Sequence, residues 1–82
     1  MKNYPHLSKA VGLALDKLRK ERKLSKTALS IHADLEERYV RAIIKGEKNP
    51  TVFVLQSLSE ALGITLTELF TSVDEFSSNI NR

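Results

Sequence analysis

The chain has 82 residues, 41% of them hydrophobic and 28% charged, with a formal net charge of +3 and no cysteine. This length suits one domain, and the composition is that of a globular soluble protein. Because there is no cysteine to form a disulfide or ligate zinc, and no apolar run reaches the length of a signal or membrane segment, we expect a cytoplasmic protein without a membrane partner.

The charge is distributed unevenly along the chain. Residues 1–50 contain twelve Lys and Arg against six Asp and Glu, a net charge of +6. Residues 51–82 contain one against four, a net charge of −3. This asymmetry predicts one face for a polyanion such as nucleic acid and another for a protein partner. A core this small also gains from burial at a subunit interface.

The chain is expected to begin with a short N-terminal arm over residues 1–7. The first predicted helix follows, from Ser8, which serves as its N-terminal cap, to about Arg22. Apolar residues recur every three or four positions and form an inward stripe of Val11, Ala14, Leu15 and Leu18. The end of this helix is crowded with cations, two or three of which are explained by the helix macrodipole. Contact with a polyanion explains the rest better, which predicts phosphate contacts by Lys20, Arg22 and Lys23.

Residues 24–50 predict two short helices separated by a tight break. The first is capped by Ser25 and lasts about two turns, until Asp34, which adopts turn conformations readily. The second is expected over residues 36–45, and Gly46 ends it in the left-handed conformation. Its apolar positions form one buried stripe of Tyr39, Val40, Ile43 and Ile44. The residues left to point outward are Glu37, Arg38, Arg41 and Lys45.

This pair of helices has two interpretations. In one it is a DNA-reading element, whose second helix lies in the major groove and presents arginines to the bases. In the other it is a helical hairpin of a small bundle, and its charges only keep the protein soluble. Periodicity alone does not separate the two.

A fourth helix, capped by Thr51, is expected to run to Leu62. Its predicted inward stripe is Val52, Leu55, Leu58, Ala61 and Leu62. Phe53 and Val54 fall outside this stripe, and an exposed aromatic residue beside an apolar one is typical of an interaction surface. We therefore expect a homodimer interface that includes Phe53, Val54 and Phe76. The alternative is that Phe76 covers Phe53 within one chain.

After Gly63, which is expected to end the fourth helix, Thr65 and Glu68 form a capping box. This capping box predicts a short fifth helix through Phe70. The remaining residues 71–82 are mostly polar, and we expect a flexible tail there. A helix packed at the dimer interface is the alternative.

The order of residues 11–70 resembles the Cro/phage-repressor (XRE-type) helix-turn-helix family. The motifs at family spacing are Leu18-Arg19, Leu24-Ser25, Ala33, Val40, Ile43, Gly46, Asn49-Pro50, Leu55, Leu58, Ala61-Leu62-Gly63 and Leu69-Phe70. The resemblance implies an all-α fold: a compact five-helix, repressor-like DNA-binding domain over residues 8–70, with the helix-turn-helix at helices 2 and 3. Such domains usually act as dimers on two-fold symmetric operators.

The resemblance also assigns contacts with double-stranded DNA. The implied base contacts are Glu37, Arg38 and Arg41. Arginine can donate two hydrogen bonds to guanine and glutamate can accept one from cytosine, although Glu37 can instead stabilise a helix N-terminus. The implied phosphate contacts around the two helices are Lys26, Thr27, Lys45, Lys48 and Asn49.

Two departures from the family pattern bear on this assignment. Family members often pair the arginine at the position of Arg19 with a glutamate on the recognition helix, but that position is Ile44 here. Arg19 therefore needs another acceptor, because an unpaired buried guanidinium is costly. Glu36 and Glu37 also place two carboxylates at the start of the recognition helix. They repel phosphate locally, and either sharpen the choice of sequence or weaken DNA binding.

We predict a sequence-specific transcriptional regulator, a dimeric repressor that binds a palindromic operator with helix 36–45 in the major groove. The alternative is an antitoxin-like interaction module, for which a protein partner such as a toxin matters more than DNA. An enzyme is not expected, since the sequence contains neither a nucleophile elbow nor a phosphate loop. We also expect no metal or other cofactor, because His6 and His32 have no partners at metal-ligand spacing.

Overall fold

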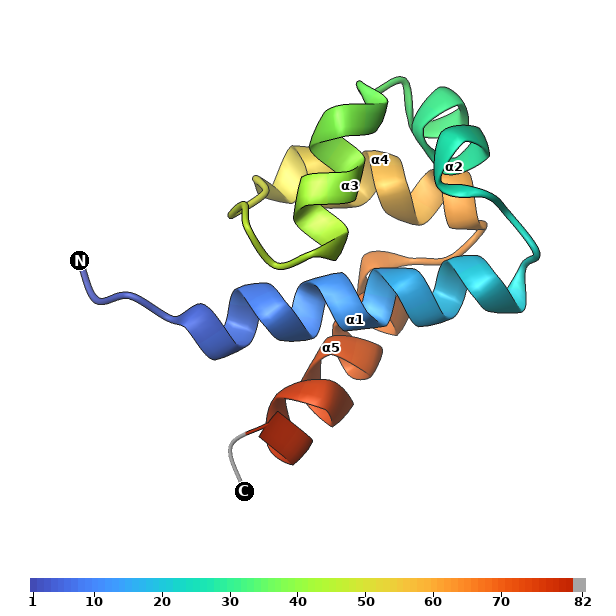
Figure 1. The fold of residues 1–82 in the computed structure, drawn as a ribbon. Coiled ribbons are helices and arrows are strands. Elements are labelled where there is room, and N and C mark those ends of the chain that lie inside the picture. The colour runs from blue at the N-terminus through green and yellow to red at the C-terminus, as the bar shows by residue number, and fades with distance from the viewer. Residues whose placement is uncertain (81–82) are drawn as a thin grey trace.

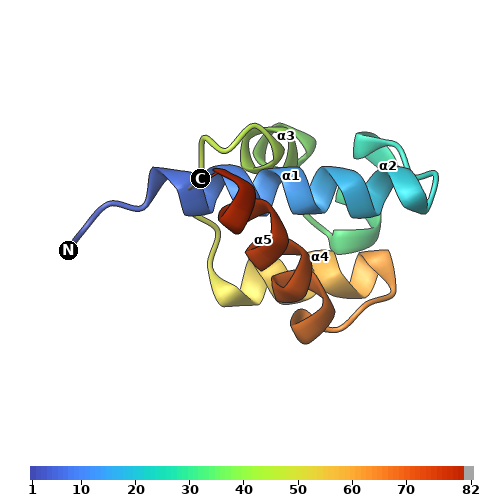
Figure 2. The same cartoon turned by 90° about the horizontal axis from the view of Figure 1, so that it is seen from below.

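Five helices make up the computed structural model, which describes residues 1–80 of the chain. They are α1 (Pro5–Glu21), α2 (Lys26–Ala33), α3 (Glu37–Ile44), α4 (Val52–Leu62) and α5 (Leu66–Ile80). Figure 1 shows α1 running across the molecule with α2, α3 and α4 on one side of it and α5 on the other. The view from below shows α5 lying across α1 and α4 (Figure 2). The prediction of a compact all-α domain is confirmed.

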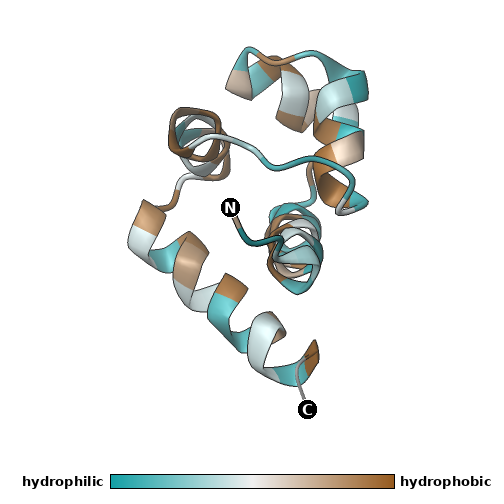
Figure 3. Cartoon of the chain, turned by 90° about the vertical axis from the view of Figure 1, so that its left-hand side faces the viewer, coloured by the Kyte–Doolittle hydropathy of each residue, from teal (hydrophilic) through white to brown (hydrophobic). Residues whose placement is uncertain are grey.

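The core forms where one apolar stripe from each helix meets the others. Hydrophobic and hydrophilic segments alternate along the helices (Figure 3), as an inward stripe requires. The largest fully buried leucine and isoleucine side chains are Leu15, Leu29, Ile43, Leu58 and Leu69, one from each helix. Each contributes roughly 1.5–3 kcal/mol by leaving water.

Gly12 lets α1 and α3 approach each other closely. A Cβ atom at this position would collide with the backbone carbonyl oxygens of Ile43 and Ile44, at the end of α3. Because backbone atoms cannot rotate away as a flexible side chain can, only glycine permits this approach. The contact fixes the C-terminal end of α3 against α1.

The predicted ends of the second, third and fourth helices are confirmed. The Ser25 hydroxyl caps α2 by accepting a hydrogen bond of 2.9 Å from a backbone N–H three residues later. Asp34 lies in the left-handed region at φ +56°, which reverses the chain between α2 and α3. Gly46 and Gly63 follow α3 and α4 with φ of +79° and +71°. The Thr51 hydroxyl caps α4 in the same way as Ser25 caps α2.

The predicted start of the first helix is wrong. α1 begins at Pro5, so that only residues 1–4 precede it and Ser8 lies inside the helix. Proline favours this early start because its fixed φ suits the first helical turn, where an N–H would be unpaired anyway. The Ser8 hydroxyl donates instead to the side-chain oxygen of Asn49, in the loop after α3.

The predicted end of the fifth helix is also wrong. The capping box forms as expected, with hydrogen bonds of 3.2 Å and 3.1 Å exchanged between Thr65 and Glu68, but α5 continues past Phe70 to Ile80. It continues because Val73 is buried and Phe76 packs against the core. The flexible tail is therefore wrong for residues 71–80, and the last two residues of the predicted tail lie outside the described residues.

The orientation of the first turn of α4 differs from the prediction at two valines. Val52, predicted to face inward, is 53% exposed, whereas Val54, predicted to face outward, is half-buried and packs against the core. The buried face of α4 is centred on Leu55, Leu58 and Leu62. At about 100° per residue both valines fall at the margins of that face, and the neighbouring helices cover only one of them.

Candidate nucleic-acid interface

α2 and α3 form a helix-turn-helix whose second helix is exposed along one face. α3 packs on α2 and on α1, and its inward residues Val40 and Ile43 are fully buried. The opposite face carries a shallow hollow lined by Glu37, Arg38, Arg41, Ala42, Lys45 and Glu47. A helix of eight residues with this division presents its cations to solvent on a rigid base. This geometry suits insertion into the major groove of a duplex.

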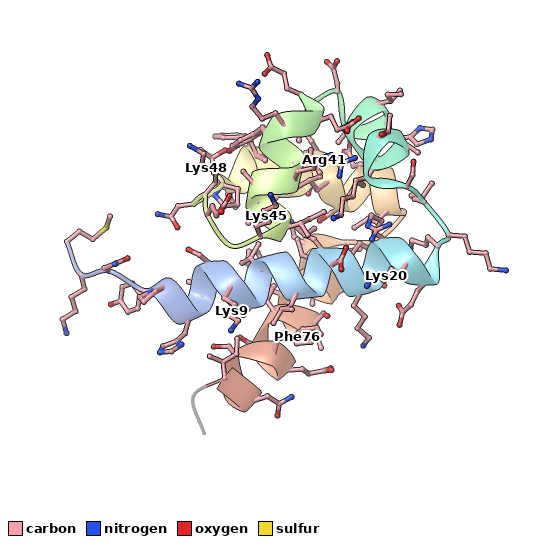
Figure 4. All side chains as sticks on the ribbon, viewed as in Figure 1. Lys9, Lys20, Arg41, Lys45, Lys48 and Phe76 are labelled. Carbon is pink, nitrogen blue, oxygen red and sulfur yellow. The ribbon has the colours of Figure 1, made fainter. Side chains whose placement is uncertain are left out.

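Cations continue from α3 onto the neighbouring segments. Figure 4 shows Arg41 and Lys45 on α3, Lys48 in the loop that follows it, and Lys9 and Lys20 on α1. All five of these side chains are exposed. They give the interface a positive potential that attracts a polyanion before any specific contact forms.

A hydrogen-bonded bridge joins α2 to α3 at the start of this surface. The Thr27 hydroxyl donates to Glu37 Oε1 at 2.6 Å, and Arg41 Nε donates to Glu37 Oε2 at 2.7 Å. These two hydrogen bonds hold the pKa of the Glu37 carboxyl below its ordinary value, the one from Thr27 having the larger effect. Glu37 is therefore charged at neutral pH and engaged on both of its oxygens.

Arg19 finds the acceptor that the sequence left open. Its Nε and Nη2 donate to Asp16 Oδ1 at 3.1 Å and 2.7 Å, and its Nη1 donates to the Leu24 carbonyl oxygen at 2.8 Å. The two side chains are only 13% and 23% exposed. Burial raises the pKa of Asp16, but hydrogen bonds from Arg19 and Lys20 outweigh burial and hold it below its ordinary value. The arginine thereby fixes the turn that leads into Ser25 and α2.

Comparisons with known proteins identify this arrangement. A helix-turn-helix family model matches residues 15–69, about two thirds of the chain. An HTH-type transcriptional regulator of Sinorhizobium fredii, y4dJ, is 33% identical over 69 residues, covering 84% of this chain and 90% of that protein. The protein belongs to the XRE/Cro/C1-type helix-turn-helix family. It is a DNA-binding transcriptional regulator and not an enzyme, as predicted, and the hairpin of an unrelated bundle is ruled out.

Two further similar proteins are control proteins. Control protein C.MunI of a Mycoplasma species is 38% identical over 65 residues, which cover 78% of this chain and 88% of that protein. The crystal structure of the restriction-modification controller protein C.AhdI from Aeromonas hydrophila matches with 29% identity and a TM-score of 0.74. It covers 76% of this chain and 94% of that one.

Most of the phosphate contacts predicted for this regulator lie on or beside the helix-turn-helix. Lys26 and Thr27 open α2, where Lys26 is half-buried and Thr27 donates to Glu37. Lys48 and Asn49 are exposed in the loop after α3, and Asn49 is held by Ser8. Lys45, at the end of α3, is also exposed and lies between these two groups. Lys45, Lys48 and Asn49 therefore follow one another at the C-terminal end of α3, whereas Lys26 and Thr27 lie on α2.

The predicted contacts at the end of α1 are arranged differently. Arg22 donates from Nε to the Leu62 carbonyl oxygen and from Nη1 to the Leu18 carbonyl oxygen, so it ties α1 to the end of α4. Lys20 forms an ion pair of 3.2 Å with Asp16 and remains 67% exposed. Lys23 is exposed in the turn after α1, at φ +57°. Of these three side chains, that of Arg22 is the one that ties two helices together.

Sequence reasoning missed several of these internal contacts and left the acceptor of Arg19 open. Asp16 was detectable as a partner for Arg19, since residues three apart share a helix face. The bridge of Glu37 and the contact of Ser8 with Asn49 join different elements, and no local pattern signals them. They depend on how the helices pack.

The three residues predicted for the dimer interface differ in their exposure. Phe53 is 81% exposed, which excludes the alternative that Phe76 covers it. Phe76 and Val54 are half-buried against the core of their own chain, so neither stands out as a free apolar contact. A separate apolar groove of about 260 Å³ lies between the N-terminal residues, α1, the loop before α4 and α5. Its apolar lining residues are Met1, Tyr4, Leu7, Val11, Pro50, Leu55 and Phe70.

Over residues 1–80 no single helix is long and apolar enough to cross a membrane. Among these residues, α4 and α5 reach that length and apolar character only when taken together, and the two helices are bent by 102° relative to each other. Within the same residues no group of three His, Cys, Asp or Glu side chains is placed to hold a metal ion.

Proposed function

We propose that this regulator is a homodimeric repressor that binds a palindromic operator in the cytoplasm, with α3 in the major groove. The observation that carries the proposal is the exposed face of α3, where Arg38 and Arg41 project from a helix whose other face is buried. An arginine paired bidentately with guanine discriminates against the wrong base by about 1–3 kcal/mol. Two such arginines per subunit are enough to define a half-site.

Phosphate contacts around α3 supply the rest of the affinity and set the register. We assign these contacts to Lys26 and Thr27 on one side of α3 and to Lys45, Lys48 and Asn49 on the other. Lys20 and Lys23 extend them towards the end of α1. Each cation that neutralises a phosphate releases a counterion, so affinity falls steeply with salt. Arg22 is left out of this set, since it holds α4.

The dimer forms through Phe53 on the first turn of α4. Its ring is 81% exposed, and the neighbouring Val52 is 53% exposed, so the two side chains offer an apolar contact to a second copy. In a two-fold arrangement the Phe53 rings of the two copies pack against each other's α4. Burying one phenylalanine contributes roughly 1.5–3 kcal/mol. The two copies of α3 then lie about 34 Å apart, one turn of DNA, and match two half-sites.

Repression follows from occupancy, because a dimer bound over a promoter excludes the polymerase. The similarity to control proteins supports a regulatory role on DNA. The same exposed Phe53 also suits the alternative of an antitoxin-like module whose principal partner is a protein such as a toxin. The two functions depend on different residues. Binding to the operator by a repressor depends on the arginines of α3, whereas binding to a protein partner by an interaction module depends on Phe53.

Selection from a randomised duplex library, with fluorescence anisotropy at two salt concentrations, tests the proposal. The repressor should enrich a palindrome above a background that weakens with salt. Salt-dependent binding without any enriched sequence would refute sequence-specific repression. In that case capture of a toxin-like protein that depends on Phe53 would favour the interaction module.

A further inference from the structure

Glu37 occupies an unusual position for a residue predicted to read a base. Each of its carboxylate oxygens already accepts a short hydrogen bond, one from Thr27 and one from Arg41. Charge-assisted hydrogen bonds of 2.6–2.7 Å are among the stronger ones in proteins. Turning the carboxylate towards a cytosine would break at least one of them.

The bridge also determines which part of Arg41 is available. Only Nε of its guanidinium donates to Glu37, and no residue in the described part of the chain accepts a hydrogen bond from Nη1 or Nη2. The side chain remains 45% exposed. The two terminal nitrogens, Nη1 and Nη2, are therefore available to donate, while Nε of the same guanidinium is held by Glu37. Two such donors match the O6 and N7 acceptors of guanine.

We propose that Glu37 is a positioning residue that holds Arg41 so that its two Nη groups read one guanine of each half-site end-on. Thr27 anchors the Glu37 carboxylate to α2. The orientation of Arg41 therefore depends on how α2 and α3 pack against each other. The inference rests on the proposed function, because it assigns a specific base to the same interface. It replaces the prediction that Glu37 itself contacts a base.

Preorganisation explains why a carboxylate is tolerated so close to phosphate. A free arginine must give up rotamer freedom when it binds, whereas one held by Glu37 has already done so. The carboxylate repels the duplex in general while it favours one orientation of one guanidinium. Glu37 therefore lowers affinity for every sequence and raises the preference for the correct one.

The test compares three single variants by library selection and by anisotropy on the selected operator. Glu37→Ala should reduce the preference for guanine at the Arg41 position about fivefold or more, with non-specific affinity raised. Glu37→Gln retains an acceptor oxygen and should preserve part of the preference. Glu36→Gln is the matched control, since it removes the same charge one residue away, from a side chain without a capping hydrogen bond in the described structure. It should leave the preference intact.

A double-mutant cycle separates positioning from direct reading. The Arg41→Ala variant defines the base pair in question, and adding Glu37→Ala to it should cause no further loss there. Additive losses, or a loss at a different base pair in Glu37→Ala, would overturn the inference and make Glu37 a reader in its own right. If Arg41→Ala leaves every preference unchanged while an operator is still enriched, this inference fails and Arg41 is no longer one of the proposed base contacts, but the repressor function stands. If the unaltered protein enriches no operator, the proposed function fails and this inference with it.

Discussion

Replacing Asp16 with Asn should destabilise the protein in a pH-dependent way. The carboxylate of Asp16 holds Arg19 through two hydrogen bonds and pairs with Lys20, and Arg19 in turn holds the turn before α2. Asn keeps the shape of the side chain and removes the charge. Hydrogen bonds to charged groups contribute about 1.5–3 kcal/mol. The partial exposure of this pair reduces that figure, so we expect a loss of about 1–2 kcal/mol at neutral pH.

The pH dependence follows from the direction of the pKa shift. Since the pKa of Asp16 is below its ordinary value of 3.8 in the folded protein, its contribution is complete above that value. It disappears as the pH falls through the lower folded pKa. A protonated Asp16 resembles Asn, so the difference between the two proteins should vanish in acid.

Urea unfolding followed by circular dichroism measures both effects. At neutral pH the variant should unfold at lower urea, and its melting temperature should fall by about 4–16 °C for a domain of this size. Glu21→Gln is the control, because Glu21 is about half exposed and lies 4.0 Å from Lys17. That change should cost less than about 0.5 kcal/mol. Two results would refute this role of Asp16. One is a loss of stability in Asp16→Asn of less than about 0.5 kcal/mol at neutral pH. The other is a loss that persists in acid.

Three other variants probe the interface, the dimer and the packing of α3. Arg38→Ala should lose about 1–3 kcal/mol of discrimination at one base pair while its melting curve stays unchanged, and an intact preference in selection would remove Arg38 from the interface. Phe53→Glu should give monomers in sedimentation and weaken binding to a palindrome, whereas a persistent dimer would place the interface elsewhere. Gly12→Ala should destabilise the fold by about 1–3 kcal/mol or more in urea unfolding, because its Cβ meets the carbonyl groups of α3. An unchanged midpoint would mean that the two helices can move apart.

Local chemistry explains what was predictable from the sequence. Ser25, Asp34 and Gly46 each act within a few residues of their own position, so the boundaries of the helix-turn-helix follow from side-chain caps and backbone conformation. The spacing of Val40 and Ile43 likewise gave the buried face of α3. The outward arginines followed from that face by exclusion.

Tertiary packing explains what was not predictable. The length of α5 depends on the packing of Val73 and Phe76 against the core. The mostly polar sequence of residues 71–82 does not predict this packing. The burial of Val54 and the exposure of Val52 likewise depend on how the neighbouring helices pack against α4. At the interface, the bridge between Thr27 and Glu37 spans ten residues and two helices. Sequence reasoning placed Glu37 on the outward face of α3 but did not identify Thr27 as its neighbour.

The contacts that fix α3 in the fold leave the residues on its outer face free to be substituted. The helix is anchored by its inward side chains, by the approach of Gly12 near its C-terminal end and by the bridge at its N-terminal end. The exposed positions Arg38 and Lys45 belong to none of these anchors, and exposed substitutions usually change stability by less than about 0.5 kcal/mol. Related regulators can therefore diverge in the operators they recognise while sharing one scaffold, and new specificities can be engineered at these positions without redesigning the fold.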